Sequence, residues 1–126
     1  RKEEQEFCKD CTSVYHYFTR GRAVWLHKPP VSHSVYRFKY HNQREFAKYY
    51  ALEMFGRYHS IIHTWKPECI IPIPLHRKRK RKRGYNQSML IAKELSKLTK
   101  IPVFEAGLRR KRYTVPQKTL DYKTRR

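Results

Sequence analysis

Seven consecutive cationic side chains, from Arg77 to Arg83, are the part of this sequence best suited to chemistry. They predict phosphate binding, because the planar guanidinium of arginine grips phosphate oxygens in pairs. A short apolar run, Cys69 to Leu75, precedes the cations, and Asn86 opens a helical pattern after them. The N–H groups at the start of a helix point outward at an anion, and nearby cations add to that attraction. The stretch as a whole therefore predicts a place to hold phosphate.

The elements that would position these side chains are predicted from apolar spacing. The run from Cys69 to Leu75 is rich in β-branched residues and contains two prolines, which is typical of a strand buried in a parallel sheet. The cationic run predicts a loop that stops at Gly84, and residues 86–99 predict a helix. Residues 101–104 predict a second strand. A strand, helix and strand in this order form a right-handed crossover, so the sequence predicts an α/β fold with a parallel sheet.

The first half of the chain predicts further elements in front of this unit. Residues 21–28 are a modest strand candidate, and apolar spacing predicts a short helix that starts near Pro30. Asn42 and Glu45 have the spacing of a capping box, which predicts an amphipathic helix that ends near Gly56. The aromatic stripe of this helix is predicted to face the core.

Composition limits the classes of partner. The chain has 126 residues, which predicts one domain, and its formal charge of +20 predicts an anionic partner. Nucleic acid, a phosphorylated metabolite and an acidic membrane surface all fit that charge. The many tyrosine and phenylalanine rings could stack on bases, but most are predicted to fill a small core. No apolar run is long enough to span a bilayer, so no membrane insertion is expected.

The cysteines predict a reducing compartment and half of a metal site. Cys8, Cys11 and Cys69 do not form a disulfide framework, and no signal peptide is visible, so a cytoplasmic location is expected. Cys8 and Cys11 have the Cys-x-x-Cys spacing of half a zinc site. Two free thiols near the terminus are the alternative interpretation.

Two separated blocks of sequence carry a resemblance to a known family. The first contains Ile71-Pro72-Ile73-Pro74-Leu75-His76 and, after the basic residues, Arg83-Gly84-Tyr85-Asn86-Gln87. The second runs from Leu108 to Gln117. In order and distance they resemble the signature of the competence protein F family (ComF, ComFC and GntX-like proteins).

That family is similar to type I phosphoribosyltransferases, and the resemblance implies a partial phosphoribosyltransferase-like domain over residues 21–126. A remnant zinc-ribbon segment over residues 1–20 would precede it, with Cys8 and Cys11 as metal ligands.

The resemblance also implies ligands and site residues. The pyrophosphate loop of the family would follow Leu75, and its phosphate-binding positions match His76, Arg77, Arg83, Gly84, Asn86 and Gln87. The block that resembles the flexible loop over the site contains Arg109, Arg112 and Gln117. The implied ligands are phosphoribosyl pyrophosphate (PRPP) or pyrophosphate, with magnesium as the cofactor of the parent family. The implied role is in competence and DNA uptake, alongside other competence or DNA-processing proteins.

One part of the family pattern is absent. The acidic PRPP loop, two aspartates followed by Thr-Thr-Gly, is expected beyond Gln117, and the chain reaches Arg126 without it. No nucleophile, general base or pair of carboxylates stands out, so no catalytic residue is assigned and the magnesium site is expected to be incomplete. Two alternatives stay open: a basic module that binds single-stranded nucleic acid, such as single-stranded DNA, without chemistry, and an inert truncation product.

Overall fold

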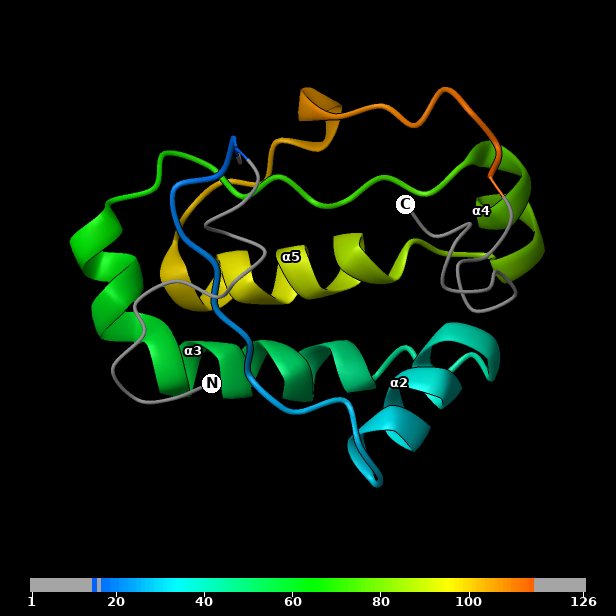
Figure 1. Ribbon diagram of the computed structural model, residues 1–126, viewed down its shortest axis with the longest axis horizontal. Coiled ribbons are helices and arrows are strands. Elements are labelled where there is room, and N and C mark those ends of the chain that lie inside the picture. Colours follow the sequence, from blue (N-terminus) through cyan, green and yellow to red (C-terminus); the bar gives the residue numbers. More distant parts are fainter. Residues whose placement is uncertain (1–14, 16, 115–126) are drawn as a thin grey trace.

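The structure is a computed structural model that describes residue 15 and residues 17–114. Its helices are α2 (Val31–Tyr40), α3 (Phe46–Trp65), α4 (Arg77–Arg83) and α5 (Gln87–Thr99), and the 3-10 turn η1 (Glu105–Gly107) follows them (Figure 1). Within the described residues, no helix combines the length and apolar character needed to cross a membrane.

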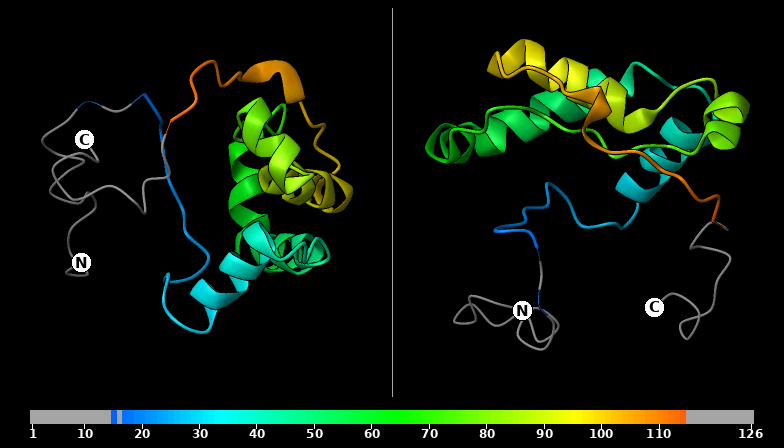
Figure 2. Two further views of the ribbon diagram at one scale, coloured as in Figure 1. Left: turned by 90° about the vertical axis from the view of Figure 1, so that its right-hand side faces the viewer. Right: turned by 90° about the horizontal axis from the view of Figure 1, so that it is seen from above.

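The two long helices form the body of the molecule. α3 and α5 make the most extensive contact between elements, and they lie side by side with the same direction (Figures 1 and 2). An extended segment, residues 66–76, returns along α5 and places α4 at the end where α3 and α5 begin. The short helix α2 lies at that same end. The basic helix therefore lies close to α2, although the two are far apart in the sequence.

The predicted parallel sheet is wrong, because the described residues contain no sheet. The two predicted strands do lie parallel, but a single bridge between Ile70 and Val103 is their only strand pairing. In it, the N–H of Ile70 donates to the Pro102 carbonyl at 2.8 Å, and the N–H of Phe104 donates to the Ile70 carbonyl at 2.9 Å. Pro72 and Pro74 follow immediately, and proline has no N–H with which to extend a ladder. Two short segments with one bridge cannot make a sheet without further strands.

Burial in these segments also differs from the prediction of a strand covered on both faces. Pro72 is buried, whereas Ile71 is 42% exposed and Ile73 is 63% exposed. The segment 21–28 forms no strand either.

The helices are predicted better than the strands. α2 and α5 occupy the residues that the apolar spacing indicated. α3 is an amphipathic helix as predicted, but it continues past Gly56 to Trp65, because a glycine inside a helix costs only about 1 kcal/mol relative to alanine and does not end the helix by itself. Asn42 does not cap it: its φ is 54°, and its side chain accepts a hydrogen bond from Arg44 Nε at 2.8 Å.

A small core forms where α2, α3 and the start of α5 meet. Phe38, Ala47 and Tyr85 are buried there, with Tyr50 and Leu90 partly buried against them. The Tyr85 hydroxyl donates to the Phe38 carbonyl, which lies in the last turn of α2 and has no partner within that helix. This hydrogen bond connects the segment that follows the basic helix α4 to α2.

Most described aromatic rings are outside this core, contrary to the prediction that they fill it. Tyr85 and Phe38 are the only aromatic side chains among the buried residues described. The tyrosines left largely exposed are Tyr15, Tyr17, Tyr36, Tyr40, Tyr49 and Tyr113.

Candidate phosphate-binding site

The cationic run is a helix and not the predicted loop. Its seven residues keep their side chains at the surface, where water screens their mutual repulsion, and lysine and arginine favour helix. His76 caps its start, with Nδ1 accepting from the N–H of Lys78 at 3.3 Å. Gly84 ends it in the left-handed region with φ of 83°, a conformation that glycine adopts without strain.

The helical conformation divides five of the seven cations between two sides of α4. At about 100° per residue, Arg77 and Lys80 project to one side. The opposite side carries Arg79, Lys82 and Arg83. Each side lines a separate hollow in the surface.

The first hollow, here the basic cleft, has a volume of about 630 Å³ and receives residues from both sequence blocks. His76, Arg77 and Lys80 lie on its α4 side. The second block supplies three further cations, Arg109, Arg110 and Lys111. Its remaining lining residues are Pro72, Pro74, Leu75, Asn86, Glu105, Ala106 and Leu108.

Asn86 joins the extended segment to α5 beside this cleft. Its Oδ1 accepts from the N–H of Ser88 at 3.1 Å and caps α5, while its Nδ2 donates to the Ile73 carbonyl at 3.1 Å. One side chain thereby fixes the helix start relative to the segment that carries His76. This double role explains why an asparagine suits the position.

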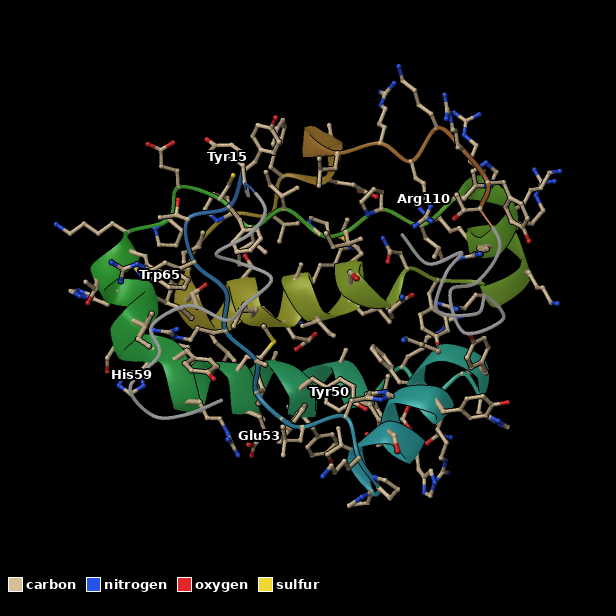
Figure 3. The ribbon with its side chains drawn as sticks, in the orientation of Figure 1. Tyr15, Tyr50, Glu53, His59, Trp65 and Arg110 are labelled. Carbon is tan, nitrogen blue, oxygen red and sulfur yellow. The ribbon has the colours of Figure 1, made fainter. Side chains whose placement is uncertain are left out.

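Contacts from the segment 108–114 hold the second block against α4. The Tyr113 ring lies 5.2 Å from the His76 ring, and Arg79 Cζ lies 5.4 Å from the Tyr113 ring centroid. Arg79 also donates to the Thr114 carbonyl, and Arg110 Nη2 donates to Thr114 Oγ1 at 2.5 Å. Arg110 is thus held beside α4 (Figure 3). The two sequence blocks therefore meet through direct contacts as well as through a shared cleft.

The structure brings together only some of the residues implied by the resemblance. His76, Arg77, Asn86 and Arg109 line the basic cleft. Arg83 lies on the other side of α4, where its Nη1 donates a hydrogen bond to Gln87 Oε1 at 2.5 Å. Gly84 ends the helix. Arg112 lines neither hollow. Gln117 and the metal candidates Cys8 and Cys11 lie outside the described residues.

The sequence interpretation missed several residues that line the cleft: Lys80, Glu105, Arg110 and Lys111. Helical spacing from Arg77 would have indicated Lys80, had the basic run been interpreted as a helix. The other three depend on how the chain returns after α5, for which the sequence carries no local signal.

The second hollow, here the tyrosine pocket, lies between the end of α2 and the opposite side of α4. Its volume is about 440 Å³. It is lined by Lys39, Tyr40, Asn42, Arg79, Lys82, Arg83, Tyr85 and Tyr113.

Tyr85 forms part of this pocket and is electrostatically perturbed. Burial raises its pKa above that of an ordinary tyrosine, and the nearby charges of Arg83 and Arg44 oppose that rise. Arg44 Cζ lies 4.8 Å from the Tyr85 ring centroid, a cation–π contact. The neutral phenol, which donates to the Phe38 carbonyl, is thus the favoured form at physiological pH.

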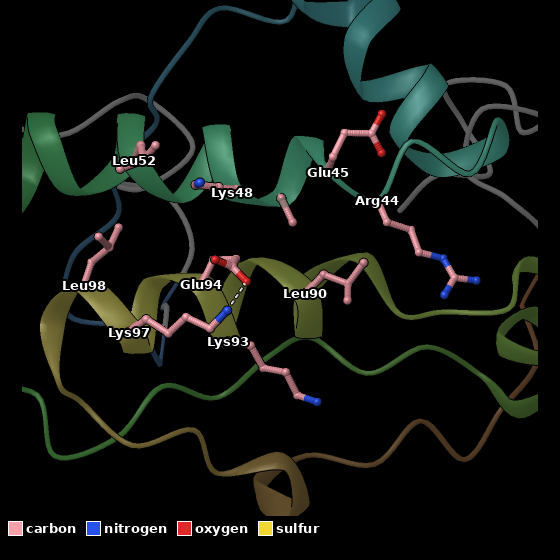
Figure 4. A pocket seen from close by; sticks show the side chains of 10 residues that line it. Arg44, Glu45, Lys48, Leu52, Leu90, Lys93, Glu94, Lys97 and Leu98 are labelled. Carbon is pink, nitrogen blue, oxygen red and sulfur yellow. Dashed lines mark hydrogen bonds and ion pairs between the residues drawn. The ribbon is translucent and has the colours of Figure 1, made fainter.

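A third hollow, between α3 and α5, differs in character. Its volume is about 610 Å³, and its side chains project from the facing sides of the two helices and from the turn before α3 (Figure 4). Leucines line it together with charges of both signs, and one of these acids is neutralised by the Glu94–Lys97 ion pair at 2.6 Å. This mixture does not favour an anion as the basic cleft does.

The donor set of the basic cleft does not fit magnesium. Glu105 is the only carboxylate among the described residues that line it. No group of three or more histidine, cysteine, aspartate or glutamate side chains in the described part of the chain could hold a metal. Magnesium prefers several oxygen ligands, and here cations surround the single carboxylate.

One comparison with known proteins identifies the relationship of this chain. Competence protein F of Haemophilus influenzae is 37% identical to it over 127 residues. The chain belongs to the competence protein F family. The alignment covers 96% of this chain and 54% of that relative, so the chain spans about half the relative's length. No protein-family profile matches the chain, and no solved structure matches it. The family resemblance of the two sequence blocks is thus confirmed.

Proposed function

We propose that this competence protein F family member binds the diphosphate group of pyrophosphate or PRPP in the basic cleft, and that it acts in competence as the name of its relative indicates. The observation that carries the proposal is the convergence of the two sequence blocks on one cleft. Five cations from two segments far apart in the chain line it, which are Arg77, Lys80, Arg109, Arg110 and Lys111.

The chemistry of these residues suits a diphosphate. Pyrophosphate carries several negative charges within a small volume, and guanidinium groups arranged around it can each form charge-assisted hydrogen bonds. The volume of about 630 Å³ lies within the range of small-molecule sites. His76 adds an imidazole ring to the cleft. Its Nδ1 accepts a hydrogen bond from the backbone N–H of Lys78, so in the neutral ring Nε2 carries the proton and can donate to an anion.

The same residues support binding without catalysis. Phosphoribosyl transfer passes through a cation-like sugar, so the reaction needs groups that position the ribose and stabilise developing positive charge. Glu105 is the only acidic side chain that the described residues place in the cleft. We therefore expect pyrophosphate and PRPP to bind with similar affinity, and magnesium to change that affinity little.

Calorimetric titration of the chain with pyrophosphate and with PRPP, each with and without magnesium, tests the proposal. The Arg109→Ala variant should weaken both ligands by about 10-fold or more, because a charge-assisted contact is lost. Arg57→Ala removes the same charge from α3, where Arg57 lies near Glu53 at the surface, and should have little effect. Absence of saturable pyrophosphate binding at low salt would contradict the proposal. Strong, magnesium-dependent selectivity for PRPP would show that other carboxylates complete the site.

A further inference from the structure

We propose that Tyr113 is a positioning residue of the basic cleft: its ring, held against the start of α4, places the cations of the second sequence block at the diphosphate. Tyr113 does not line the cleft itself, but lines the tyrosine pocket on the other side of α4. The inference rests on the proposed function and extends it, because it assigns a role to a residue for which the family resemblance implied none.

The basic cleft brings together two segments that repel each other. α4 consists of seven consecutive cations, and the second block carries four more over residues 109–112. Like charges in close proximity destabilise such an arrangement, and Glu105 is the only carboxylate among the described residues that line the cleft. An uncharged contact is therefore needed to keep the second block beside α4.

The ring of Tyr113 provides that contact. Its centroid lies 5.2 Å from the His76 ring centroid, in an edge-to-face arrangement. Arg79 Cζ lies 5.4 Å from the Tyr113 ring centroid, and Lys78 Nζ lies 5.8 Å from it. The face of an aromatic ring carries partial negative charge and attracts cations. One uncharged side chain of the second block thus contacts three groups from the start of α4.

Hydrogen bonds of the next residue, Thr114, extend this contact toward the cleft. Arg79 donates to the Thr114 carbonyl, and Arg110 Nη2 donates to Thr114 Oγ1 at 2.5 Å. Arg79 therefore contacts two consecutive residues of the second block, and Arg110, which lines the basic cleft, is bonded to the second of them. A cation that is held in place before the ligand arrives loses less conformational freedom on binding, which favours affinity.

Calorimetric titration of pyrophosphate into Tyr113→Ala at low ionic strength tests the inference. Ordering one long side chain costs about 2- to 13-fold in affinity, and the second block supplies three cations to the cleft. Tyr113→Ala should therefore weaken pyrophosphate binding by about fivefold or more, although it removes no charge and no residue that lines the cleft. The contacts of Tyr113 described above are made by its ring, so Tyr113→Phe should bind pyrophosphate within about twofold of the unaltered chain.

Tyr40→Ala is the matched control. Tyr40 is 49% exposed and Tyr113 is 54% exposed, and an arginine of α4 lies over each ring. Arg83 Cζ lies 5.2 Å from the Tyr40 ring centroid, but Tyr40 belongs to α2 and not to the second block. Loss of the Tyr40 ring should therefore leave pyrophosphate affinity nearly unchanged. Circular dichroism shows whether both variants keep their helices.

Double variants show whether Tyr113 acts through the second block. When Tyr113→Ala is combined with Arg109→Ala, the loss should be smaller than the product of the two single losses, because both changes weaken the contribution of the same segment. When it is combined with Arg77→Ala, the two losses should multiply, because Arg77 is placed by α4 itself. A merely structural role would couple Tyr113 to Arg77 and Arg109 alike.

Three outcomes would overturn the inference. The first is pyrophosphate binding by Tyr113→Ala equal to that of the unaltered chain, which would leave the proposed function intact. The second is an equal loss in Tyr113→Ala and Tyr40→Ala. The third is coupling of Tyr113 to Arg77 that is as strong as its coupling to Arg109. If the unaltered chain binds no pyrophosphate, the proposed function and this inference fail together.

Discussion

Replacing Arg77 by alanine tests the basic cleft most directly, and the same replacement of Arg83 is its matched control. Both residues are arginines of α4, so the two variants lose the same charge and the same helix-forming side chain. Arg77 lines the basic cleft, whereas Arg83 lines the tyrosine pocket. Family resemblance placed both at the diphosphate, but the structure turns them to different sides of the helix.

The expected effects on pyrophosphate affinity differ by an order of magnitude. Loss of a charge-assisted hydrogen bond at Arg77 should cost about 1.5–3 kcal/mol, or roughly 10- to 150-fold in Kd. Arg83 lies six residues further along α4, which is about 9 Å of helical rise. At about 10 Å in water, two unit charges interact by ~0.4 kcal/mol, so about three charges on pyrophosphate give ~1.2 kcal/mol. Physiological salt screens this to roughly 0.4 kcal/mol, which is about twofold in Kd.

Calorimetry at physiological ionic strength distinguishes the two effects, with circular dichroism to show that both variants keep their helices. Equal losses in Arg77→Ala and Arg83→Ala would refute the division of α4 into two sides. A larger loss in Arg83→Ala would place the diphosphate in the tyrosine pocket. Repeating the titrations at higher salt is a further check, because the Arg83 effect is long-range and should disappear first.

Two further predictions concern stability and metal content. Tyr85→Phe should lower the free energy of unfolding by about 1 kcal/mol in urea denaturation, because the Phe38 carbonyl loses its hydrogen bond. Since the pKa of Tyr85 is raised in the folded state, its contribution is present below about pH 10 and is lost as the pH rises through the raised value. Tyr85→Phe should therefore lose less stability than the unaltered chain above pH 10, and parallel curves would contradict this. Cys8 and Cys11 supply half a ligand set, so zinc should be removed by dialysis, whereas one retained zinc per chain would require further ligands.

The sequence predicted α2, α3 and α5 because each of these helices has a periodic apolar side. In α5, the spacing of apolar residues and the cap at Asn86 agree, and the helix starts one residue after that cap. α2 likewise follows Pro30 directly. These signals are local, so they do not depend on what the helices pack against.

The sheet could not be predicted in the same way, because strand pairing is not a local property. The run from Cys69 to Leu75 has the β-branched composition of a buried strand. Yet Ile71 is 42% exposed and Ile73 is 63% exposed, and one bridge is the only strand pairing that the described residues show for it. A short apolar run shows that a segment is extended, but further strands must lie beside it to make a sheet. The composition of this run predicted a strand within a sheet, but the described residues pair with it at a single bridge.

The basic run shows how one wrong local assignment changes a functional prediction. As a loop, all seven cations could surround one anion, and the family resemblance then assigned Arg77 and Arg83 to the same diphosphate. As a helix, α4 fixes the direction of each side chain by its position, so the run cannot gather around a single ligand. Five of the seven cations line one of the two hollows, and Lys78 and Arg81 line neither. Arg77 and Lys80 contribute to the basic cleft, while Arg79, Lys82 and Arg83 contribute to the tyrosine pocket. Because the two hollows lie on opposite sides of one helix, a charge change on one side should affect binding on the other side only weakly.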